Sequence, residues 1–413
     1  MRLRIFLLLL FLSGNLFAQD IVEWRGPNRS GVYPDKDLLK SWSENGPKLL
    51  LELDKIGNGY SSPVVYKNTI FVTGLKDTLD VISAYDITGQ KKWEMPYGRA
   101  WARTFPETRS TPTIENNRIY LISGMGQVVC IDAVSGKLVW SVDAQNMFKG
   151  EPHKWGIAES AAISDKAVFY VTGGEETSVI ALDKLNGKLL WKTKSLGGTR
   201  AYAFSVIIEK AGLKLLLAQT ANNLMAVNIE TGDIVWSFDL LPYHPGSIGV
   251  GANTNTPLYF DNKIFITSGY DHPGVLLQLA DDAKSVSVAW TNPDFDNHIG
   301  GVVKVGNYLF GSNWKTNTTG NWMCVDWNTG RTIYETKWLN KGPIISADGM
   351  LYCMEEKSGN VALVKPTPEK FDVVSSFKLE TGTGPYWAHP AIFEGKLYIR
   401  HGECLLVYDL KNN

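Results

Sequence analysis

The feature that most constrains the fold of this chain is a short string that recurs five times within its 413 residues. Each copy holds an Asp or Asn, a Gly three or four residues later, and an aromatic residue four positions beyond that Gly. The copies are AYDITGQKKW (84–93), CIDAVSGKLVW (130–140), ALDKLNGKLLW (181–191), AVNIETGDIVW (226–236) and CVDWNTGRTIY (324–334). A Gly between two apolar, alternating segments is typical of a tight turn that needs positive φ, so each copy predicts a β-hairpin.

A second repeated unit precedes the hairpins and consists of a strand, a polar turn and a strand rich in β-branched and aromatic residues. Eight copies are present, and their equivalent positions lie 42 to 51 residues apart: Pro63, Pro112, Ala161, Val206, Pro257, Gly301, Pro343 and Pro390. Four strands in a little under fifty residues are typical of one propeller blade. The sequence therefore predicts an all-β, eight-bladed propeller of four-stranded antiparallel blades, with inner strands starting near 61, 110, 160, 204, 255, 300, 342 and 389.

The two ends of the repeat predict how the ring closes. The last copy ends at Leu410 without a fourth strand, whereas GPKLLLELD at 46–54 resembles a fourth strand that has no blade of its own. We expect Leu49–Leu53 to pair with Cys404–Tyr408, which removes an open sheet edge. The repeated aromatic residues should pack between neighbouring blades, and Trp290 and Phe377 are interpreted as the same device in less regular blades.

The first residues and the charge balance indicate where the protein works. Arg2 and Arg4 precede an unbroken apolar run of eight, Ile5–Leu12, which is shorter than the roughly 20 residues of a membrane span. Residues 1–19 are predicted to be a signal peptide and residues 20–413 one propeller domain, exported to the periplasm or beyond. The run has no neighbouring Cys for a lipid anchor, no later segment is apolar enough to span a membrane, and 41 Lys+Arg against 42 Asp+Glu argue against nucleic-acid binding.

The repeat resembles that of the pyrroloquinoline-quinone (PQQ) propellers, the quinoprotein alcohol dehydrogenase-like superfamily. The opening WRGPNRSGV from Trp24 is similar to the start of secreted PQQ-like repeat proteins. The resemblance implies one of two types of protein. Dehydrogenases hold PQQ over Ca²⁺ with an Asp base and, in many cases, an adjacent pair of cysteines. Barrel-assembly lipoproteins of the outer membrane have no chemistry and bind a protein partner. This chain has neither adjacent cysteines nor a lipid-bearing Cys, so it fits neither template fully.

A propeller places ligands at its central channel, where the inner strands converge. The residue before each aligned position is small in seven blades, as a crowded axis requires, and His389 is the exception. We treat His389 as a candidate functional residue because imidazole can titrate or ligate, with a structural role as the alternative.

Further candidates lie one or more residues earlier on the same strands. Arg109 and Lys341 suit an anionic group such as a quinone carboxylate or a sugar acid, and Trp387 suits stacking on a ring. The resemblance implies that Glu159, Asn255 and Asp296 bind Ca²⁺ and that Glu159 or Asp296 acts as the base. The alternative is an ordinary solvated rim. Two loops rich in aromatic residues, 99–110 and 313–322, are expected to cap the channel.

Two functions follow from these observations. The first is an exported PQQ-binding quinoprotein that oxidises alcohols or sugars with PQQ and Ca²⁺. The second is a non-catalytic periplasmic scaffold or binding protein that serves envelope assembly or polysaccharide handling, with a protein or carbohydrate partner.

Overall fold

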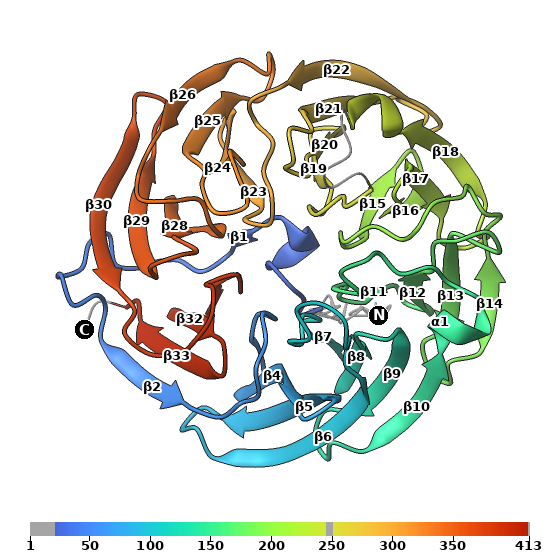
Figure 1. The fold of residues 1–413 in the computed structure, drawn as a ribbon, viewed down its shortest axis with the longest axis horizontal. Helices are drawn as coiled ribbons and strands as arrows, with labels where there is room; N and C mark the ends of the chain where they lie inside the picture. Colours follow the sequence, from blue (N-terminus) through green and yellow to red (C-terminus); the bar gives the residue numbers. More distant parts are fainter. Residues whose placement is uncertain (1–20, 245–250, 412–413) are drawn as a thin grey trace, which may run out of the picture.

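Eight antiparallel sheets stand around a central axis in the computed structural model, which describes residues 21–244 and 251–411 (Figure 1). This arrangement confirms the predicted eight-bladed propeller of four-stranded blades. The predicted signal peptide, residues 1–19, lies outside the described residues. Within the described part of the chain, no helix has the length and apolar character needed to cross a membrane.

The first four blades follow one another along the chain, each running from the axis outward. Their strands are β3 (Val64–Tyr66), β4 (Thr69–Lys76), β5 (Leu79–Asp86) and β6 (Lys91–Arg99) in blade 1; β7 (Thr113–Glu115), β8 (Arg118–Ile122), β9 (Gln127–Asp132) and β10 (Leu138–Asp143) in blade 2; β11 (Ala162–Ile163), β12 (Ala167–Val171), β13 (Val179–Asp183) and β14 (Leu189–Lys192) in blade 3; and β15 (Val206–Lys210), β16 (Leu213–Gln219), β17 (Asn223–Asn228) and β18 (Ile234–Asp239) in blade 4.

The next three blades repeat this order. Their strands are β19 (Leu258–Phe260), β20 (Lys263–Ile266), β21 (Gly274–Leu279) and β22 (Val286–Asn292) in blade 5; β23 (Val302–Val305), β24 (Tyr308–Ser312), β25 (Trp322–Asp326) and β26 (Thr332–Thr336) in blade 6; and β27 (Ile344–Ala347), β28 (Met350–Met354), β29 (Asn360–Pro366) and β30 (Phe371–Lys378) in blade 7. The described helices are short: η1 (Pro27–Arg29), α1 (Ala144–Met147) and η2 (Leu241–Tyr243).

Blade 8 is built from both ends of the described chain, as predicted. Its strands are β31 (Ala391–Phe393), β32 (Lys396–His401), β33 (Cys404–Asp409) and β2 (Leu49–Leu53). The outer strand β2 pairs antiparallel with β33, with Leu49 opposite Tyr408 and Leu53 opposite Leu405. The blade therefore has its fourth strand, and the ring has no unfilled position.

The repeated Gly and Trp form one recurring contact between adjacent blades. A Cβ atom added to Gly187 of blade 3 would lie 2.8 Å from the indole ring of Trp140 of blade 2, and the Trp140 indole donates to Lys184 O at 3.0 Å. The same pair of contacts joins Trp93 to Gly136 and Ala133 O, Trp191 to Gly232 and Ile229 O, and Trp290 to Gly330 and Trp327 O. The repeat is thus the contact that joins one blade to the next, as the sequence predicts.

Phe377 makes an equivalent contact from a different register. Its ring lies 2.6 Å from the Cβ position of Gly46, just before β2, and it packs on Tyr408. The register break in blade 7 falls between Leu363 and Val364, which makes Ser375 the positional equivalent of the repeated aromatic residue. Phe377, two residues further along, takes over its packing.

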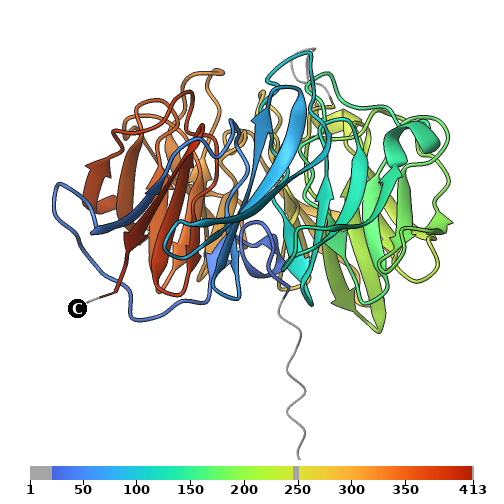
Figure 2. The same ribbon diagram turned by 90° about the horizontal axis from the view of Figure 1, so that it is seen from below.

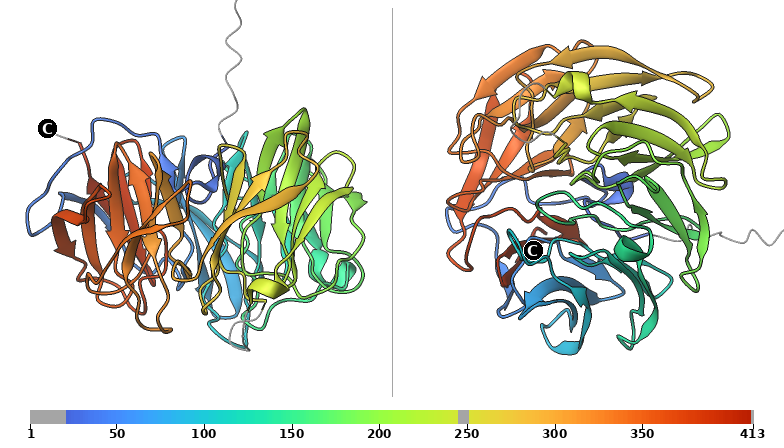
Figure 3. Two further views of the ribbon diagram at one scale, coloured as in Figure 1. Left: turned by 90° about the horizontal axis from the view of Figure 1, so that it is seen from above. Right: turned by 45° about the vertical axis from the view of Figure 1, so that its right-hand side comes forward.

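An N-terminal arm, residues 21–33, enters the ring from one face and lies near the axis (Figures 2 and 3). Its strand β1 (Val32–Tyr33) pairs in parallel with β27 and adds a fifth strand to blade 7. Arg25 donates to the carbonyl oxygens of Val302 and Ile344, and Arg29 donates to those of Ser160 and Ala161. Two buried arginines therefore fix the arm to blades 3, 6 and 7.

Candidate functional site

The small residues that line the axis join neighbouring blades. The amide of Ser62 donates to Thr111 Oγ1, and the amide of Thr111 donates to Ser160 Oγ, both at 2.9 Å. A Cβ atom on Gly300 would lie 2.2 Å from Gly342 O, which explains why larger side chains are absent there. The predicted crowding at the axis is therefore real in these blades.

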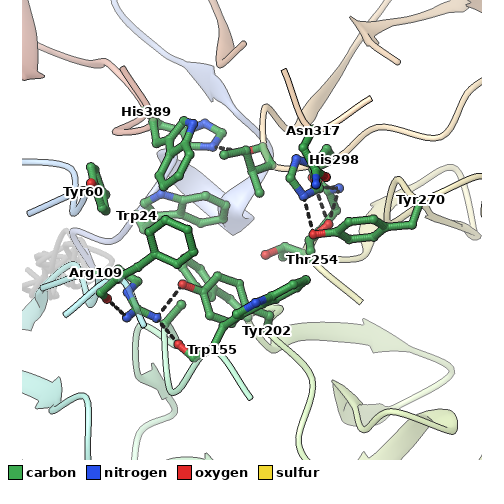
Figure 4. Close-up of a pocket in the computed structure, with 17 residues that line it drawn as sticks. Trp24, Tyr60, Arg109, Trp155, Tyr202, Thr254, Tyr270, His298, Asn317 and His389 are labelled. Atoms are coloured by element: carbon green, nitrogen blue, oxygen red, sulfur yellow. Dashed lines mark hydrogen bonds between the residues drawn. The ribbon is translucent and has the colours of Figure 1, made fainter. Parts of the chain in front are cut away.

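A cavity of about 320 Å³ occupies the axis above the arm (Figure 4). Its floor contains Trp24 of the arm with Phe204, Ile299 and His389. The remaining lining residues are Tyr60, Phe105, Arg109, Trp155, Ala158, Tyr202, Thr254, Asn255, Thr256, Tyr270, His298, Asn317 and Trp387. Phe105 and Asn317 come from the two aromatic-rich loops, 99–110 and 313–322, so both loops reach the cavity.

Arg109 lies in the cavity wall, and its guanidinium is held by the protein itself. Its Nη1 donates to Tyr202 Oη at 2.6 Å, and the guanidinium carbon Cζ lies 5.5 Å from the centre of the Tyr202 ring. Its other donors bind the backbone carbonyl oxygens of Thr104, Phe105, Glu107 and Trp155. With five N–H groups available to a guanidinium, this set leaves none free for a ligand carboxylate.

His389 reaches across the axis from blade 8. Its Nε2 lies 2.9 Å from Ile299 O, which can only accept, so Nε2 carries the proton. Burial lowers the pKa of His389 to about 3, with the nearby Arg25 charge acting in the same direction. The ring also packs edge-on against Trp24 at 5.1 Å. The geometry is that of a neutral imidazole that positions the cavity floor.

Asn255 lies in the opposite wall, among uncharged polar groups. Its Nδ2 donates to Asn297 O at 2.7 Å and to His298 O at 2.6 Å. His298 Nε2 lies 2.7 Å from Tyr270 Oη, and burial lowers the pKa of His298 to about 3. Figure 4 shows His298, Tyr270, Thr254 and Asn317 on one side of the cavity, with Tyr60 and Arg109 on the other.

Trp387 completes the aromatic wall. Its ring centre lies 5.0 Å from that of Tyr60 and 5.5 Å from that of Phe105. Trp155 stacks on Tyr270 at 5.7 Å, which joins the aromatic wall to the polar one. Four predicted site residues, Arg109, Asn255, Trp387 and His389, therefore line one cavity.

Glu159 does not line this cavity. It is 1% exposed, and its Oε2 lies 2.5 Å from Arg200 Nη2, while Ser205 Oγ donates to its Oε1 at 3.1 Å. Burial raises the pKa of this carboxyl, and the Arg200 charge opposes that effect. Both oxygens thus have partners within the protein.

Asp296 and Lys341 also lie outside the cavity lining. Asp296 accepts backbone N–H groups from Trp314 at 3.0 Å and Asp271 at 3.1 Å, and burial raises the pKa of its carboxyl to about 7. Lys341 pairs with the buried Glu356 and donates to Asn317 O at 3.0 Å. These two residues support the loops around the cavity and do not face into it.

The residues present do not fit PQQ and Ca²⁺. Among the described residues that line the cavity there is no Asp, Glu or Lys, and the donors of Arg109 already have partners. Ca²⁺ takes mainly carboxylate and carbonyl oxygens, and the quinone carries carboxylates that need free cations. No group of three or more His, Cys, Asp or Glu within residues 21–244 and 251–411 is placed to hold a metal ion. The predicted ligand set of Glu159, Asn255 and Asp296 is not assembled at this cavity.

Four aromatic residues of the lining, Trp24, Trp155, Tyr202 and Tyr270, were not predicted from the sequence. Trp155 and Tyr202 lie on loops between blades, Tyr270 lies on the loop between β20 and β21 of blade 5, and Trp24 lies in the arm. A partial signal was available: Trp24, Trp155 and Trp387 do not follow the period of the repeat. Six other tryptophans also depart from the period and are not lining residues: Trp42, Trp101, Trp314, Trp322, Trp327 and Trp338.

Comparisons with known proteins agree with this fold. A family model described as "Outer membrane protein assembly factor BamB" matches residues 78–336. The BamB protein of Shewanella oneidensis is 21% identical over 335 residues, covering 78% of this chain and 77% of that protein. The crystal structure of BamB from Moraxella catarrhalis superposes with a TM-score of 0.63 at 13% identity, covering 88% of this chain and all of that one.

A second group of relatives consists of quinone-dependent dehydrogenases. The 1-butanol dehydrogenase (quinone) of Thauera butanivorans is 27% identical over 155 residues, which is 35% of this chain. The match spans only a quarter of the length of that dehydrogenase.

Proposed function

Because this chain belongs to the PQQ-like propeller family whose model is described as outer membrane protein assembly factor BamB, we propose that it is an exported, non-catalytic binding protein of the cell envelope. Its ligand site is the central cavity. The observation that carries the proposal is the cavity lining, which combines aromatic rings with uncharged polar groups and a single Arg whose donors already have partners. Such a lining can bind and orient a small molecule, and it lacks a group that would exchange protons with one.

The donor set argues against the enzymatic alternative. A quinone dehydrogenase needs a base within hydrogen-bond reach of the substrate hydroxyl. Glu159 and Asp296 are the carboxyls proposed for that role, and both are bound by protein groups outside the cavity. The imidazoles of His298 and His389 have a pKa of about 3, because burial disfavours their charged forms, so they would be poor proton acceptors.

The cavity also favours a ligand-binding protein over a scaffold that binds only other proteins. A scaffold needs an outer surface and no internal site. A cavity of about 320 Å³ with buried polar groups at its wall is within the usual range for a small-molecule site, which begins at roughly 300 Å³. The likeness to an assembly factor supports an envelope location without chemistry, and the cavity adds a ligand.

The test uses the purified exported chain, with binding followed by intrinsic tryptophan fluorescence and thermal unfolding. PQQ with Ca²⁺ is one arm, and a panel of small neutral metabolites, alcohols and sugars is the other. We expect saturable binding from the second arm, and no retained quinone or dye-linked alcohol oxidation from the first. Turnover after reconstitution with PQQ and Ca²⁺ would overturn the proposal. So would a lack of response to every compound in both arms.

A further inference from the structure

The cavity has two chemically different walls. Tyr60, Phe105, Trp387 and Tyr202 supply aromatic surface from blades 1, 3 and 8 and their loops. The facing wall carries the uncharged side chains of Thr254, Thr256, Asn255, His298 and Asn317, together with Tyr270, whose hydroxyl bonds to His298. A ligand that fits must offer one apolar face and one edge of hydrogen-bonding groups. A sugar ring has this division, because its C–H groups form a flat apolar face and its hydroxyls project around the rim.

The charges around the cavity further restrict the class of ligand that it can bind. Aromatic cages also bind quaternary ammonium groups, but a cationic ligand would lie beside the Arg109 guanidinium, with no carboxylate among the described lining residues. An anionic ligand would find the Arg109 donors occupied by Tyr202 and by backbone carbonyl oxygens. The charges of the cavity lining therefore favour a neutral ligand.

Several polar atoms of the lining residues have no protein partner. Thr256 Oγ1, His298 Nδ1 and His389 Nδ1 are buried and make no hydrogen bond in the described structure. Because His389 Nε2 donates to Ile299 O, its Nδ1 can only accept. None of these three atoms has exposed surface in the cavity, so a ligand hydroxyl reaches them only if neighbouring side chains shift.

The floor closes the cavity at one end. The ring centre of Trp24 lies 4.2 Å from that of Phe204 and 5.1 Å from that of His389. The arm that carries Trp24 is fixed by the hydrogen bonds of Arg25 and Arg29. A polymer cannot pass through a cavity that ends on this layer. The volume of about 320 Å³ lies at the lower end of small-molecule sites, which gives room for one or two sugar rings.

We infer that the cavity binds the terminal unit of a neutral glycan chain end-on, with the ring stacked on the aromatic wall and its hydroxyls turned to the polar wall. This inference rests on the proposed function, since it names the ligand of the same site. The rest of the glycan extends past Phe105 and Asn317 and leaves the cavity through its open end.

The experiment is a length series of neutral oligosaccharides. Glucose, mannose, galactose and N-acetylglucosamine, each with its linear oligomers of two to six units, are titrated by calorimetry and tryptophan fluorescence. For at least one series, affinity should rise from one unit to two and then stay within about threefold up to six. An affinity that climbs steadily to six units would overturn end-on binding, and tighter binding of uronic acid oligomers would overturn the neutral ligand.

Variants connect the result to this cavity. Trp387→Ala removes stacking surface and should weaken the binding of the dimer about tenfold or more. Trp338→Phe is the matched control, because Trp338 packs on Trp322 and Phe371 outside the cavity and should leave affinity unchanged. If Trp387→Ala binds sugar as tightly as the parent, the site is elsewhere and the inference fails.

The two proposals fail in different ways. A small molecule other than a sugar that binds in the cavity, with loss in Trp387→Ala, would overturn the glycan and keep the binding function. Absence of any binding in both the sugar series and the metabolite panel would overturn both.

Discussion

Tryptophan serves two regions of this molecule, and the difference separates fold from function. Trp93, Trp140, Trp191 and Trp290 recur with the blades, and each packs on a turn glycine of the next blade. Their indole N–H groups all donate to a backbone carbonyl in that same turn. Trp24, Trp155 and Trp387 break the period, lie at the axis and are only partly buried. The periodic tryptophans hold the ring, whereas these three line the cavity.

The largest expected effect comes from removing a periodic tryptophan. Trp140 is 8% exposed, and Trp140→Ala leaves a void between blades 2 and 3, at a cost of about 3–5 kcal/mol in the free energy of unfolding. Trp387→Ala should cost less than half of this, since that ring is partly exposed. Denaturant unfolding measures both. Equal losses would show that the two regions are not energetically distinct.

The regions should also differ in their response to pH. Asp296 lies near the cavity, and burial raises the pKa of its carboxyl to about 7. Between about pH 4 and 7 the carboxyl is therefore protonated in the folded protein and ionised in the unfolded chain. The folded state therefore loses stability as pH rises between about 4 and 7, and Asp296→Asn removes that loss. We expect the difference in unfolding free energy between Asp296→Asn and the parent to grow by about 2–4 kcal/mol between about pH 5 and 8.

A carboxyl of the repeat is the control for this pH effect. Asp132 accepts hydrogen bonds from the backbone and the side chain of Ser135, and these lower the pKa of its carboxyl. It is ionised in both the folded and the unfolded state above about pH 5, so Asp132→Asn should show a constant difference from the parent over the same range. A matching trend in both variants would contradict the assignment to Asp296.

Two glycines test the contact with the periodic tryptophan directly. Gly330 and Gly349 share a φ of +73°, so Ala at either position carries a similar backbone cost of about 1 kcal/mol. A Cβ atom on Gly330 would lie 2.5 Å from the Trp290 ring, whereas nothing lies within 4 Å of the position on Gly349. Gly330→Ala should therefore cost about 1–3 kcal/mol more in unfolding free energy than Gly349→Ala. Similar costs would mean that the ring shifts freely and that the contact contributes little.

The fold was predictable because its information is local and repeated. A turn glycine followed four residues later by an aromatic residue specifies one hairpin, and eight tandem units leave β2 and β33 as partners. The position of the site was also predictable, because the inner strands share one register. Arg109, Asn255, Trp387 and His389 could be placed at the axis for this reason.

The orientation of other side chains depends on partners that no local pattern identifies. Glu159 turns to Arg200, 41 residues away, and Asp296 turns to the backbone of Trp314. Lys341 turns to Glu356. In the aromatic wall, Trp387 follows the register of the inner strands, whereas Phe105 and Tyr202 come from loops between blades, where the repeat sets no register. The aromatic residues of loop 99–110 indicated Phe105, and no sequence pattern indicated Tyr202.

The smallest expected effect concerns the periodic tryptophans themselves. Trp140 Nε1 donates to Lys184 O at 3.0 Å, whereas Trp236 Nε1 is buried and has no partner in the described structure. Trp140 faces the blade 3 turn that contains Gly187. The corresponding turn for Trp236, residues 280–285 of blade 5, contains no Gly. Trp140→Phe loses a buried hydrogen bond, while Trp236→Phe removes an unsatisfied donor. Trp140→Phe should therefore cost about 1–2 kcal/mol more in unfolding free energy. If the two costs are equal, the indole N–H contributes nothing to joining the blades, and the repeat uses tryptophan for the packing of its ring alone.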